Sequence, residues 1–484
     1  MRALVVFVAA CATAPAPKPS APTQAVIDVL ALPETPDAPF RATKPPTAAS
    51  AGSFAAPLAV EAKLANGARV LVVENHAMPL IAIDIALPIG AEVVPIDKAG
   101  LSKFVTTMLT EGTRRLPRIA LAERLGDLAL DLDAQSDREM VHVRIDGLAE
   151  TAPDAIALVA GVLTEPAFAA DDVERIRGVL QAALARRKAW PTGVAWDEAE
   201  RLLFGAMHPL GQSNAGTEKS LAAITRADLV AFHDRWYRPD GAVIAISGDI
   251  TPAAAVALLE KHLGSWRAKP SARPTLPALP ALHGGVTLID VPGTSQTTVY
   301  VIGRWPSARD PDRVAGMILS KAFGELFGSR LNLNLRETKG WTYRVTSEPD
   351  ALRASGLIEI FANIETPFTA EALAEYYKEI ETMRLGVWRA GELDKARAAI
   401  IHSLPTKFES NVSIAATMAQ LALDGLPLDY YRTLPDAVAK VSEAELARVA
   451  KAYLVPAQMP AIVVGPRTSE AKLRALNRGP IEVR

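Results

Sequence analysis

Two stretches of this chain recur at almost the same spacing, and that internal repeat constrains the fold more than any other feature. Residues 224–249 (ITRADLVAFHDRWYRPDGAVIAISGD) align without a gap on residues 441–466 (VSEAELARVAKAYLVPAQMPAIVVGP), at an offset of 217. Residues 99–113 align on residues 315–329 at an offset of 216. Two independent matches at nearly one offset indicate a duplicated domain of roughly 210 residues, far longer than the repeat of a solenoid.

The order of predicted elements is the same in both halves. Each half opens with two β-rich runs, at 68–76 and 80–91 in the first and at 285–292 and 297–305 in the second. Stretches of helical periodicity follow, and further strands, more helices and a closing strand come after them. Strands and helices are mixed without strict alternation. We therefore predict an α+β fold of two homologous α/β-sandwich halves rather than a doubly wound parallel sheet.

Proline-rich stretches divide the chain. Ten of the 36 prolines lie between Pro15 and Pro57, and chain of this composition is extended and cannot pack a core. A second proline-rich stretch, KPSARPTLPALPALHGG, lies near the middle of the remaining chain. We predict four segments after the N-terminal one: a Pro/Ala-rich tether at 12–57, a first domain at 58–268, a linker at 269–285 and a second domain at 286–484.

The segment 1–11, MRALVVFVAAC, resembles the signal peptide of a bacterial lipoprotein. Arg2 precedes a short apolar run, and Val-Ala-Ala-Cys is similar to a lipobox, whose cysteine is lipidated and becomes the mature N-terminus. This interpretation predicts a lipid anchor at Cys11 and a location on the periplasmic side of a bacterial envelope. The alternative is an ordinary signal peptide with an incidental cysteine. Cys11 is the sole cysteine, so no intrachain disulfide can form.

Composition limits the partners that can be expected. Hydrophobic residues make up 49% and charged residues 22% of the chain, which is typical of a globular protein. The formal net charge of -2 gives no electrostatic case for nucleic acid or for a polybasic membrane patch. After the N-terminal segment, no run of about 20 apolar residues is long enough to span a bilayer. Membrane contact is therefore expected only through the N-terminal anchor.

From about residue 58 to 475 the chain resembles the pitrilysin/insulinase family of zinc metallopeptidases. The matching stretches are LANGARVLVVENHAMPLIAIDIALPIGA, HPLGQSNAGTEKSLAAITRADLVAFHDRWYRPD and SRLNLNLRETKGWTY, of which the last is the most specific. The resemblance implies two homologous halves that together form half of a clamshell around a peptide. Some members hold both halves of the clamshell in one longer chain. Others, including mitochondrial processing peptidase, are dimers of chains of about this length.

The zinc motif of that family is replaced in this chain. The family's helix carries His-x-x-Glu-His with another Glu about 75 residues on, because two imidazoles four residues apart share one helix face and the Glu between them can act as a general base. In GLSKFVTTMLTEGT, Lys103 and Thr107 occupy the histidine positions and Thr106 the Glu position. The distal Glu would fall near Ala182 or Ala183. Lysine repels a cation and threonine is a poor zinc ligand. The seven histidines offer no other pair at three or four residues' spacing, so we predict no metal and no cofactor in this chain.

The second half keeps the family's substrate-side Arg/Tyr pair. Arg336 precedes Tyr343 by seven residues in LRETKGWTY. The pattern predicts a helix over 329–340 with Gly340 at its end, followed by a strand from Trp341. The resemblance implies that Arg336 and Tyr343 bind the scissile carbonyl and stabilise the oxyanion. The alternative is a solvated helical arginine and a strand-core aromatic.

Loss of every zinc function beside a retained Arg/Tyr pair predicts the zinc-free subunit of a heterodimeric metallopeptidase, inactive alone. The resemblance implies a homologous zinc-bearing partner and an unfolded peptide substrate. The non-catalytic subunit of processing peptidase has a glycine-rich loop, whereas SKAFGELFGSRL has two glycines, which disfavours that version. Two alternatives are left open: a non-catalytic peptide-binding or assembly protein of the same fold, and hydrolysis by unrelated residues. For the second, we find no nucleophilic triad or Gly-rich phosphate loop.

Overall fold

The computed structural model describes residues 54–267, 271–353 and 355–484. The predicted signal peptide, Cys11 and the predicted tether up to residue 53 lie outside the described residues, as do positions 269 and 270 of the predicted linker.

The described chain begins against residues of the second half. The ring centroid of Phe54 lies 5.6 Å from that of Phe408, and the Ala56 carbonyl accepts a 2.6 Å hydrogen bond from Arg432 Nε. The chain then enters the first strand of the first half at Val60. The last four positions of the predicted tether thus pack on the folded body.

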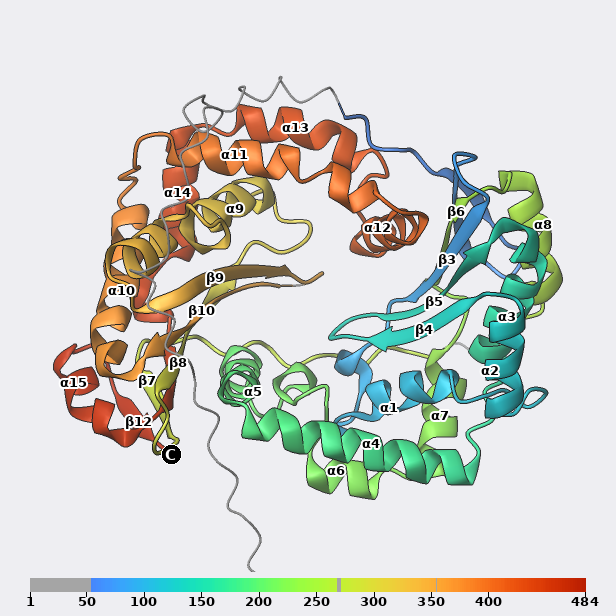
Figure 1. Ribbon diagram of the computed structural model, residues 1–484, viewed down its shortest axis with the longest axis horizontal. Coiled ribbons are helices and arrows are strands. Elements are labelled where there is room, and N and C mark those ends of the chain that lie inside the picture. The colour runs from blue at the N-terminus through green and yellow to red at the C-terminus, as the bar shows by residue number, and fades with distance from the viewer. Residues whose placement is uncertain (1–53, 268–270, 354) are drawn as a thin grey trace, which may run out of the picture. The chain divides into compact units, whose positions relative to one another are not determined.

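Two six-stranded sheets of matching topology form that body (Figure 1). Their orders are β1-β2-β6-β3-β5-β4 and β12-β7-β11-β8-β10-β9. In each sheet the closing strand pairs parallel with the first long strand and antiparallel with the second. The first sheet contains β1 (Val60–Lys63), β2 (Arg69–Glu74), β3 (Leu80–Leu87), β4 (Asp131–Ser136), β5 (Val141–Leu148) and β6 (Val243–Gly248). The second contains β7 (Val286–Asp290), β8 (Gln296–Trp305), β9 (Thr342–Ala351), β10 (Gly356–Glu365), β11 (Ala461–Gly465) and β12 (Ile481–Val483).

Helices cover the sheets, as the mixed pattern predicts, and the α+β fold with two homologous halves is confirmed. The helices of the first half are α1 (Leu101–Leu109), α2 (Arg118–Asp127), α3 (Ala152–Thr164), α4 (Ala170–Ala189), α5 (Pro191–Phe204), α6 (Glu218–Ala223), α7 (Arg226–Trp236) and α8 (Pro252–Leu263). Those of the second half are α9 (Arg313–Ser320), α10 (Thr369–Arg384), α11 (Glu392–His402), α12 (Asn411–Asp424), α13 (Tyr430–Lys440), α14 (Glu443–Tyr453) and α15 (Glu470–Ala475). Two π-helical segments, η7 (Lys321–Glu325) and η8 (Asn332–Thr338), lie between α9 and β9.

Each half has its own main core. In the first half, apolar residues of β2, β3, β5 and β6 pack with residues such as Phe104 of α1 and Ile156 of α3. In the second, residues of β8, β10 and β11 pack with residues such as Ile318 of α9 and Leu373 of α10. Capping boxes mark several helix starts, for example Thr225 with Asp228 at α7, which satisfy backbone N–H groups at the first turn.

The second face of each sheet is covered by a helix from the other half. Helix α12 belongs to the second half by sequence, yet it packs on β3 and β6 of the first sheet. Met418 and Ala419 of α12 share a buried cluster with Leu71, Ala86 and Ala245. The Asn411 carboxamide oxygen at the start of α12 accepts hydrogen bonds from Asn75 at 3.0 Å and Ser247 at 3.1 Å.

Helix α5 makes the reciprocal contact. It belongs to the first half by sequence and packs on β8 and β11 of the second sheet. Ala199 and Leu203 of α5 are fully buried against Tyr300, Ile302 and Ile462. The two halves are therefore one packing unit, although the predicted domain division at 269–285 separates them along the chain.

Two equivalent hairpin turns add charged contacts between the halves. Arg138, on the turn between β4 and β5, contacts Asp350 of β9 and lies 3.5 Å from the Glu359 carboxylate of β10. The backbone N–H of Arg353, on the turn between β9 and β10, donates a 2.8 Å hydrogen bond to the Glu139 carboxylate, and the Arg353 guanidinium lies 3.3 Å from Glu92. Buried carboxylates and arginines of both halves thus meet at one junction.

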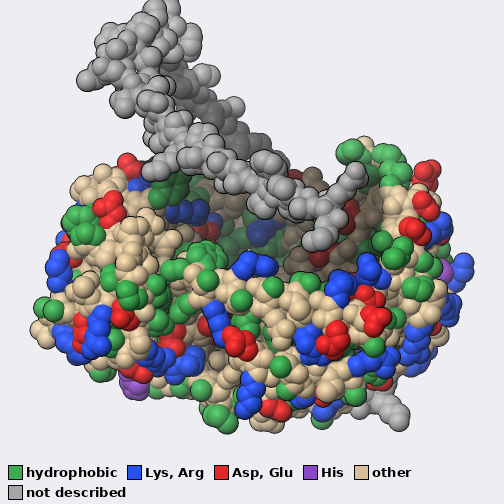
Figure 2. All heavy atoms as spheres, turned by 60° about the horizontal axis from the view of Figure 1, so that its bottom comes forward, with side chains coloured by type: hydrophobic (Ala, Val, Ile, Leu, Met, Phe, Trp, Pro, Cys, Tyr) green, Lys and Arg blue, Asp and Glu red, His purple; other side chains and the backbone are tan. Residues whose placement is uncertain are grey.

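The surface carries charges of both signs. On the face shown in Figure 2, lysine and arginine side chains are interspersed with aspartate and glutamate, in agreement with the net charge of -2. Among the described residues, none of the helices combines the length and apolar character that crossing a bilayer requires.

Burial at the junction predicts a pH-dependent stability. Burial raises the pKa of Glu92 to about 7, against the charges of Arg353 and Arg273. Burial also raises the pKa of Glu200 to about 7, against the charge of Arg138. A carboxyl group whose pKa is higher in the folded than in the unfolded protein binds its proton more tightly in the folded state, so protonation stabilises the fold. This stabilisation is fully present below the unfolded pKa and is lost as the pH rises through the folded pKa. The free energy of unfolding should therefore increase by about 1 kcal/mol or more when pH falls from 8 to 5.5.

Urea unfolding of the wild type and of Glu92→Gln over this pH range checks the prediction. The substitution should flatten the pH dependence, whereas Glu174→Gln, at an exposed position, should leave it unchanged. Asp228 titrates below this pH range. Although burial acts to raise its pKa, hydrogen bonds from Lys98 and Thr225 lower the pKa to about 2. Equal slopes in wild type and Glu92→Gln would contradict the assignment.

Candidate functional site

Helix α1 carries Lys103, Thr106 and Thr107, the three positions at which we predict that the zinc motif of the family is replaced. It runs from Leu101 to Leu109, between Gly100 and Gly112, which confirms the predicted helix. Both glycines adopt positive φ, +90° at Gly100 and +111° at Gly112. A Cβ at Gly100 would lie 2.9 Å from the Cα of Gly216, so a larger residue would push the helix start away from the 213–217 turn. The helix is thus intact where its metal ligands are replaced.

Thr106 is a structural residue in the place of a general base. It is 1% exposed, and its hydroxyl donates to the Ser102 carbonyl at 2.8 Å. The hydroxyl of Tyr237, at the end of α7, lies 2.9 Å from the same oxygen. Burial raises the pKa of Tyr237 well above its usual range, so this hydroxyl remains a neutral donor. The contact joins α1 to the end of α7. A threonine hydroxyl, unlike a glutamate carboxylate, cannot act as a general base toward water.

Lys103 places a cation where the first ligand would stand. Its side chain is exposed, although partial desolvation and then the charge of Arg187 lower its pKa. Thr107 donates to the Lys103 carbonyl at 2.9 Å. Ala182 and Ala183, near the expected distal Glu position, lie on α4, which packs against α1. One ammonium group, two hydroxyls and the methyl groups of two alanines do not fit a zinc ion.

A wider search gives the same result for the described residues. Within residues 54–267, 271–353 and 355–484, no three His, Cys, Asp or Glu side chains are grouped so that they could hold a metal ion.

The structure brings Arg336 and Tyr343 together. Arg336 lies on η8, and Gly340, at φ +67°, ends that helical segment before β9 begins at Thr342. The Arg336 Cζ lies 5.5 Å from the centroid of the Tyr343 ring. The Tyr343 residue is 83% exposed, and its hydroxyl is free to face a ligand. A cationic fork and a neutral hydroxyl donor are the groups that bind and polarise a carbonyl oxygen.

Phe327 is a third member of this cluster, and it was not predicted. Its ring centroid lies 3.6 Å from Arg336 Cζ, and the residue is 68% exposed. It lies on the short loop between η7 and η8, beside Gly328. Sequence pattern does not distinguish an exposed loop phenylalanine from one in the core. The sole local signal for Phe327 is its position next to Gly328, which indicates a loop.

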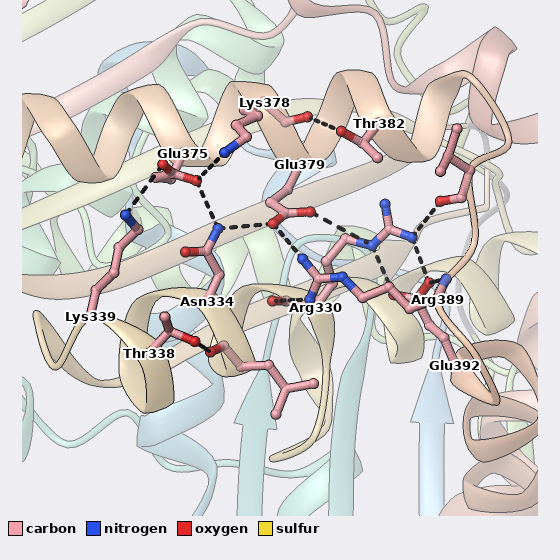
Figure 3. Close-up of polar contacts among 12 residues, drawn as sticks. Arg330, Asn334, Thr338, Lys339, Glu375, Lys378, Glu379, Thr382, Arg389 and Glu392 are labelled. Carbon is pink, nitrogen blue, oxygen red and sulfur yellow. Dashed lines mark hydrogen bonds and ion pairs between the residues drawn. The ribbon is translucent and has the colours of Figure 1, made fainter.

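A buried ion-pair network supports the segment that carries Arg336 (Figure 3). Arg330, 1% exposed, forms a two-pronged contact with Glu392 and donates to the Val387 carbonyl at 2.8 Å. Asn334 donates to Glu375 and Glu379 of α10, both at 2.8 Å. Against burial, the Asn334 bond and the nearby lysines hold the pKa of Glu375 below its usual range. The network fixes one side of the π-helix to α10 and α11.

Comparisons with known proteins show the family to which the chain is similar. Residues 223–400 match the model described as the peptidase M16 inactive domain, and residues 69–213 match the model described as insulinase (peptidase family M16). Among curated relatives, an uncharacterised zinc protease of Mycobacterium leprae is 30% identical over 302 residues, which cover 62% of this chain and 67% of that protein. A non-peptidase homologue, YmxG, of Helicobacter pylori is 25% identical over 400 residues, or 80% of this chain and 90% of that protein.

Solved structures share the fold. A peptidase M16 inactive domain from Pseudomonas fluorescens superposes with a TM-score of 0.79 at 24% identity, covering 84% of this chain and 98% of that one. The periplasmic protease PqqL of Escherichia coli superposes with a TM-score of 0.71 at 16% identity, covering 87% of this chain and 49% of that one. This chain therefore matches about half of the longer PqqL chain.

The environment of Thr106 predicts different costs for two neighbouring substitutions. Thr106→Val leaves the buried Tyr237 hydroxyl without an acceptor and should lower the free energy of unfolding by about 1–3 kcal/mol. Thr107→Val removes only a bond within the helix and should cost about 0.5 kcal/mol or less. Chemical denaturation of both variants measures the difference. Equal costs would show that the Thr106–Tyr237 contact does not stabilise the protein.

Proposed function

The chain belongs to the insulinase family of peptidases (family M16), and from that premise we propose that it is the zinc-free subunit of a heterodimeric peptidase. The observation that carries the proposal is the contrast between the two halves. Lys103, Thr106 and Thr107 replace the metal ligands on α1, whereas Arg336 and Tyr343 lie together and reach solvent. Arg336 is half-buried and Tyr343 is 83% exposed, so the pair can contact a ligand at the surface of this chain.

The pair suits the substrate side of peptide hydrolysis. A guanidinium remains cationic at any physiological pH and offers several directed donors. The Tyr343 phenol adds a neutral donor that can approach the same carbonyl oxygen. Donors held in this way stabilise negative charge as it develops on that oxygen. A homologous partner would bind zinc and activate water, and this chain would receive the unfolded peptide.

The length of the chain supports pairing. It matches about half of the PqqL chain, and the separately solved first half of PqqL is also similar, with a TM-score of 0.70 over 97% of that structure. A second chain of comparable length would complete a comparable assembly. We further propose a periplasmic location with a lipid anchor at Cys11, on the basis of the lipobox-like segment at 1–11.

A second candidate is a non-catalytic peptide-binding or assembly protein of the same fold. The similarity to a protein named a non-peptidase homologue favours it. The two candidates differ in what purifies with the chain: the first requires a zinc-bearing family member, and the second does not. Assays of this chain, a co-purified zinc-bearing homologue and their mixture separate them. If the homologue alone is fully active and the mixture adds nothing, the heterodimer proposal is wrong.

Tyr343→Phe tests the role of the pair. Because the Tyr343 hydroxyl reaches solvent, its removal should leave the melting temperature unchanged, while turnover by the mixture should fall by about 10². Tyr453→Phe is a matched control, because the Tyr453 hydroxyl donates to Asp310 at 3.1 Å far from the pair along the chain. That variant should lower stability slightly and leave turnover unchanged. Unchanged turnover in Tyr343→Phe would remove the proposed role.

A further inference from the structure

The Arg336 cluster is assembled from three separate segments. Phe327 comes from the loop between η7 and η8, Arg336 from η8, and Tyr343 from β9. Phe327 and Tyr343 are both largely exposed, so the solvent side provides little packing that could hold them in place. Side chains that must act together need a rigid base, since a misplacement of about 1 Å can cost about 10² in rate. Buried contacts must therefore set the position of the cluster.

Asn332 lies at the point where these segments meet. It is the first residue of η8, is 1% exposed, and its carboxamide oxygen accepts a 2.8 Å hydrogen bond from the Val345 N–H of β9. Its carboxamide nitrogen lies 2.8 Å from the Val345 carbonyl and 3.1 Å from the carbonyls of Gly324 and Leu326. The Ser329 hydroxyl oxygen is a fourth acceptor at 3.1 Å. The Asn332 side chain thus contacts Leu326 before Phe327 and Ser329 after it. It also contacts Val345 of β9, two residues after Tyr343.

The pattern of donors and acceptors requires an amide. Two N–H groups are shared among four oxygen atoms, while one oxygen faces a backbone N–H. A carboxylate of the same shape would accept the Val345 N–H but would place a second oxygen against four others. An apolar side chain would leave the Val345 N–H and several carbonyls unpaired in a buried place, which is costly. Asparagine satisfies both the backbone N–H donor on one side and the oxygen acceptors on the other.

The strand also approaches the π-helical segments closely. A Cβ on Gly324 of η7 would lie 2.7 Å from the Ser347 Cβ of β9, and the Ser320 hydroxyl lies 3.2 Å from the Ser347 hydroxyl. The Asn332 side chain therefore lies in a tightly packed seam, where a shift on one side is transmitted to the other.

We propose that Asn332 is a positioning residue, which holds the Phe327 loop and the Tyr343 strand in register with Arg336 and so preforms the substrate-side cluster. This inference rests on the proposed function of the Arg/Tyr pair. Asn332 is buried and touches no substrate; it acts through Val345, Gly324 and Leu326. Phe327, packed on the guanidinium, restricts the Arg336 fork so that less freedom is lost when a carbonyl binds.

Asn334 is a matched control on the same π-helix. It is two residues away, and it also donates two side-chain hydrogen bonds, but to Glu375 and Glu379 of α10. Asn334→Ala should therefore loosen the contact with α10 without freeing the Phe327 loop or β9. Comparing Asn332→Ala with Asn334→Ala separates loss of positioning from a general loss of helix stability.

Hydrogen exchange on the chain alone tests the structural part of the inference. Asn332→Ala should increase exchange in both 324–331 and 342–347, whereas Asn334→Ala should leave 342–347 as in the wild type. If Asn332→Ala does not fold, the isosteric Asn332→Asp is measured instead. Its carboxylate faces four oxygens, so its folded-state pKa should be raised, and exchange in the two segments should be slower at pH 5 than at pH 8 once intrinsic exchange rates are corrected. Unchanged exchange in both segments overturns the inference.

Steady-state kinetics with the zinc-bearing partner tests the catalytic part. Asn332→Ala should lower kcat by about tenfold to 10² with a KM change of about threefold or less, because the misplaced donors act in the transition state. Combined with Tyr343→Phe, it should add little to the loss, since both changes disable the same group. A loss no larger than that of Asn334→Ala, or full additivity with Tyr343→Phe, overturns the inference. If Tyr343→Phe itself has no effect, the proposed function fails, and the inference fails with it.

Discussion

The inner strands of each sheet are buried on both faces, and the second face in each case is covered by a helix from the opposite half. The inner strands have no polar face to offer water: all eight residues of β3 are buried or half-buried, and every residue of β6 and β11 is buried. Helix α12 covers the first sheet and α5 the second. Separating the halves would expose two apolar sheet faces, at a cost of about 25 cal/mol for each Å² uncovered. The structure therefore depends on this reciprocal exchange.

The exchange also explains how one half could lose its chemistry while the fold persisted. The α1 helix retains its core residues, such as Phe104 and Val105, and its flanking glycines. At the positions that differ from the zinc motif of the family, Lys103 lies at the surface and Thr106 bonds to Tyr237. The first half still supplies α5 to the second sheet, so it remains necessary for the half that carries Arg336 and Tyr343. Loss of a metal site and conservation of a scaffold are physically compatible here.

Several elements followed from local sequence. The stretch at 100–113 was expected to be helical because it aligns with the family's zinc-motif helix, and the helix before Gly340 and the strand from Trp341 were predicted from the turn residue that separates them. Other features had no local signal. The i to i+5 hydrogen bonding of η8, the stacking of Phe327 on Arg336 and the four acceptors around Asn332 all depend on segments that meet only in the folded chain. In the sequence, Asn332 could not be distinguished from a solvent-exposed polar residue on a helix.

The sequence by itself determined the duplication, the α+β class, the replacement of the zinc motif and the presence of the Arg/Tyr pair, because repeats, periodicity and residue identity are all properties of the linear chain. The tertiary structure alone decided which helix covers which sheet face, that Arg336 lies beside the rings of Phe327 and Tyr343, and that the buried Asn332 bonds to Val345 of β9. These depend on long-range packing and on hydrogen bonds whose partners lie up to 376 residues apart in the chain, and no local pattern encodes such distances.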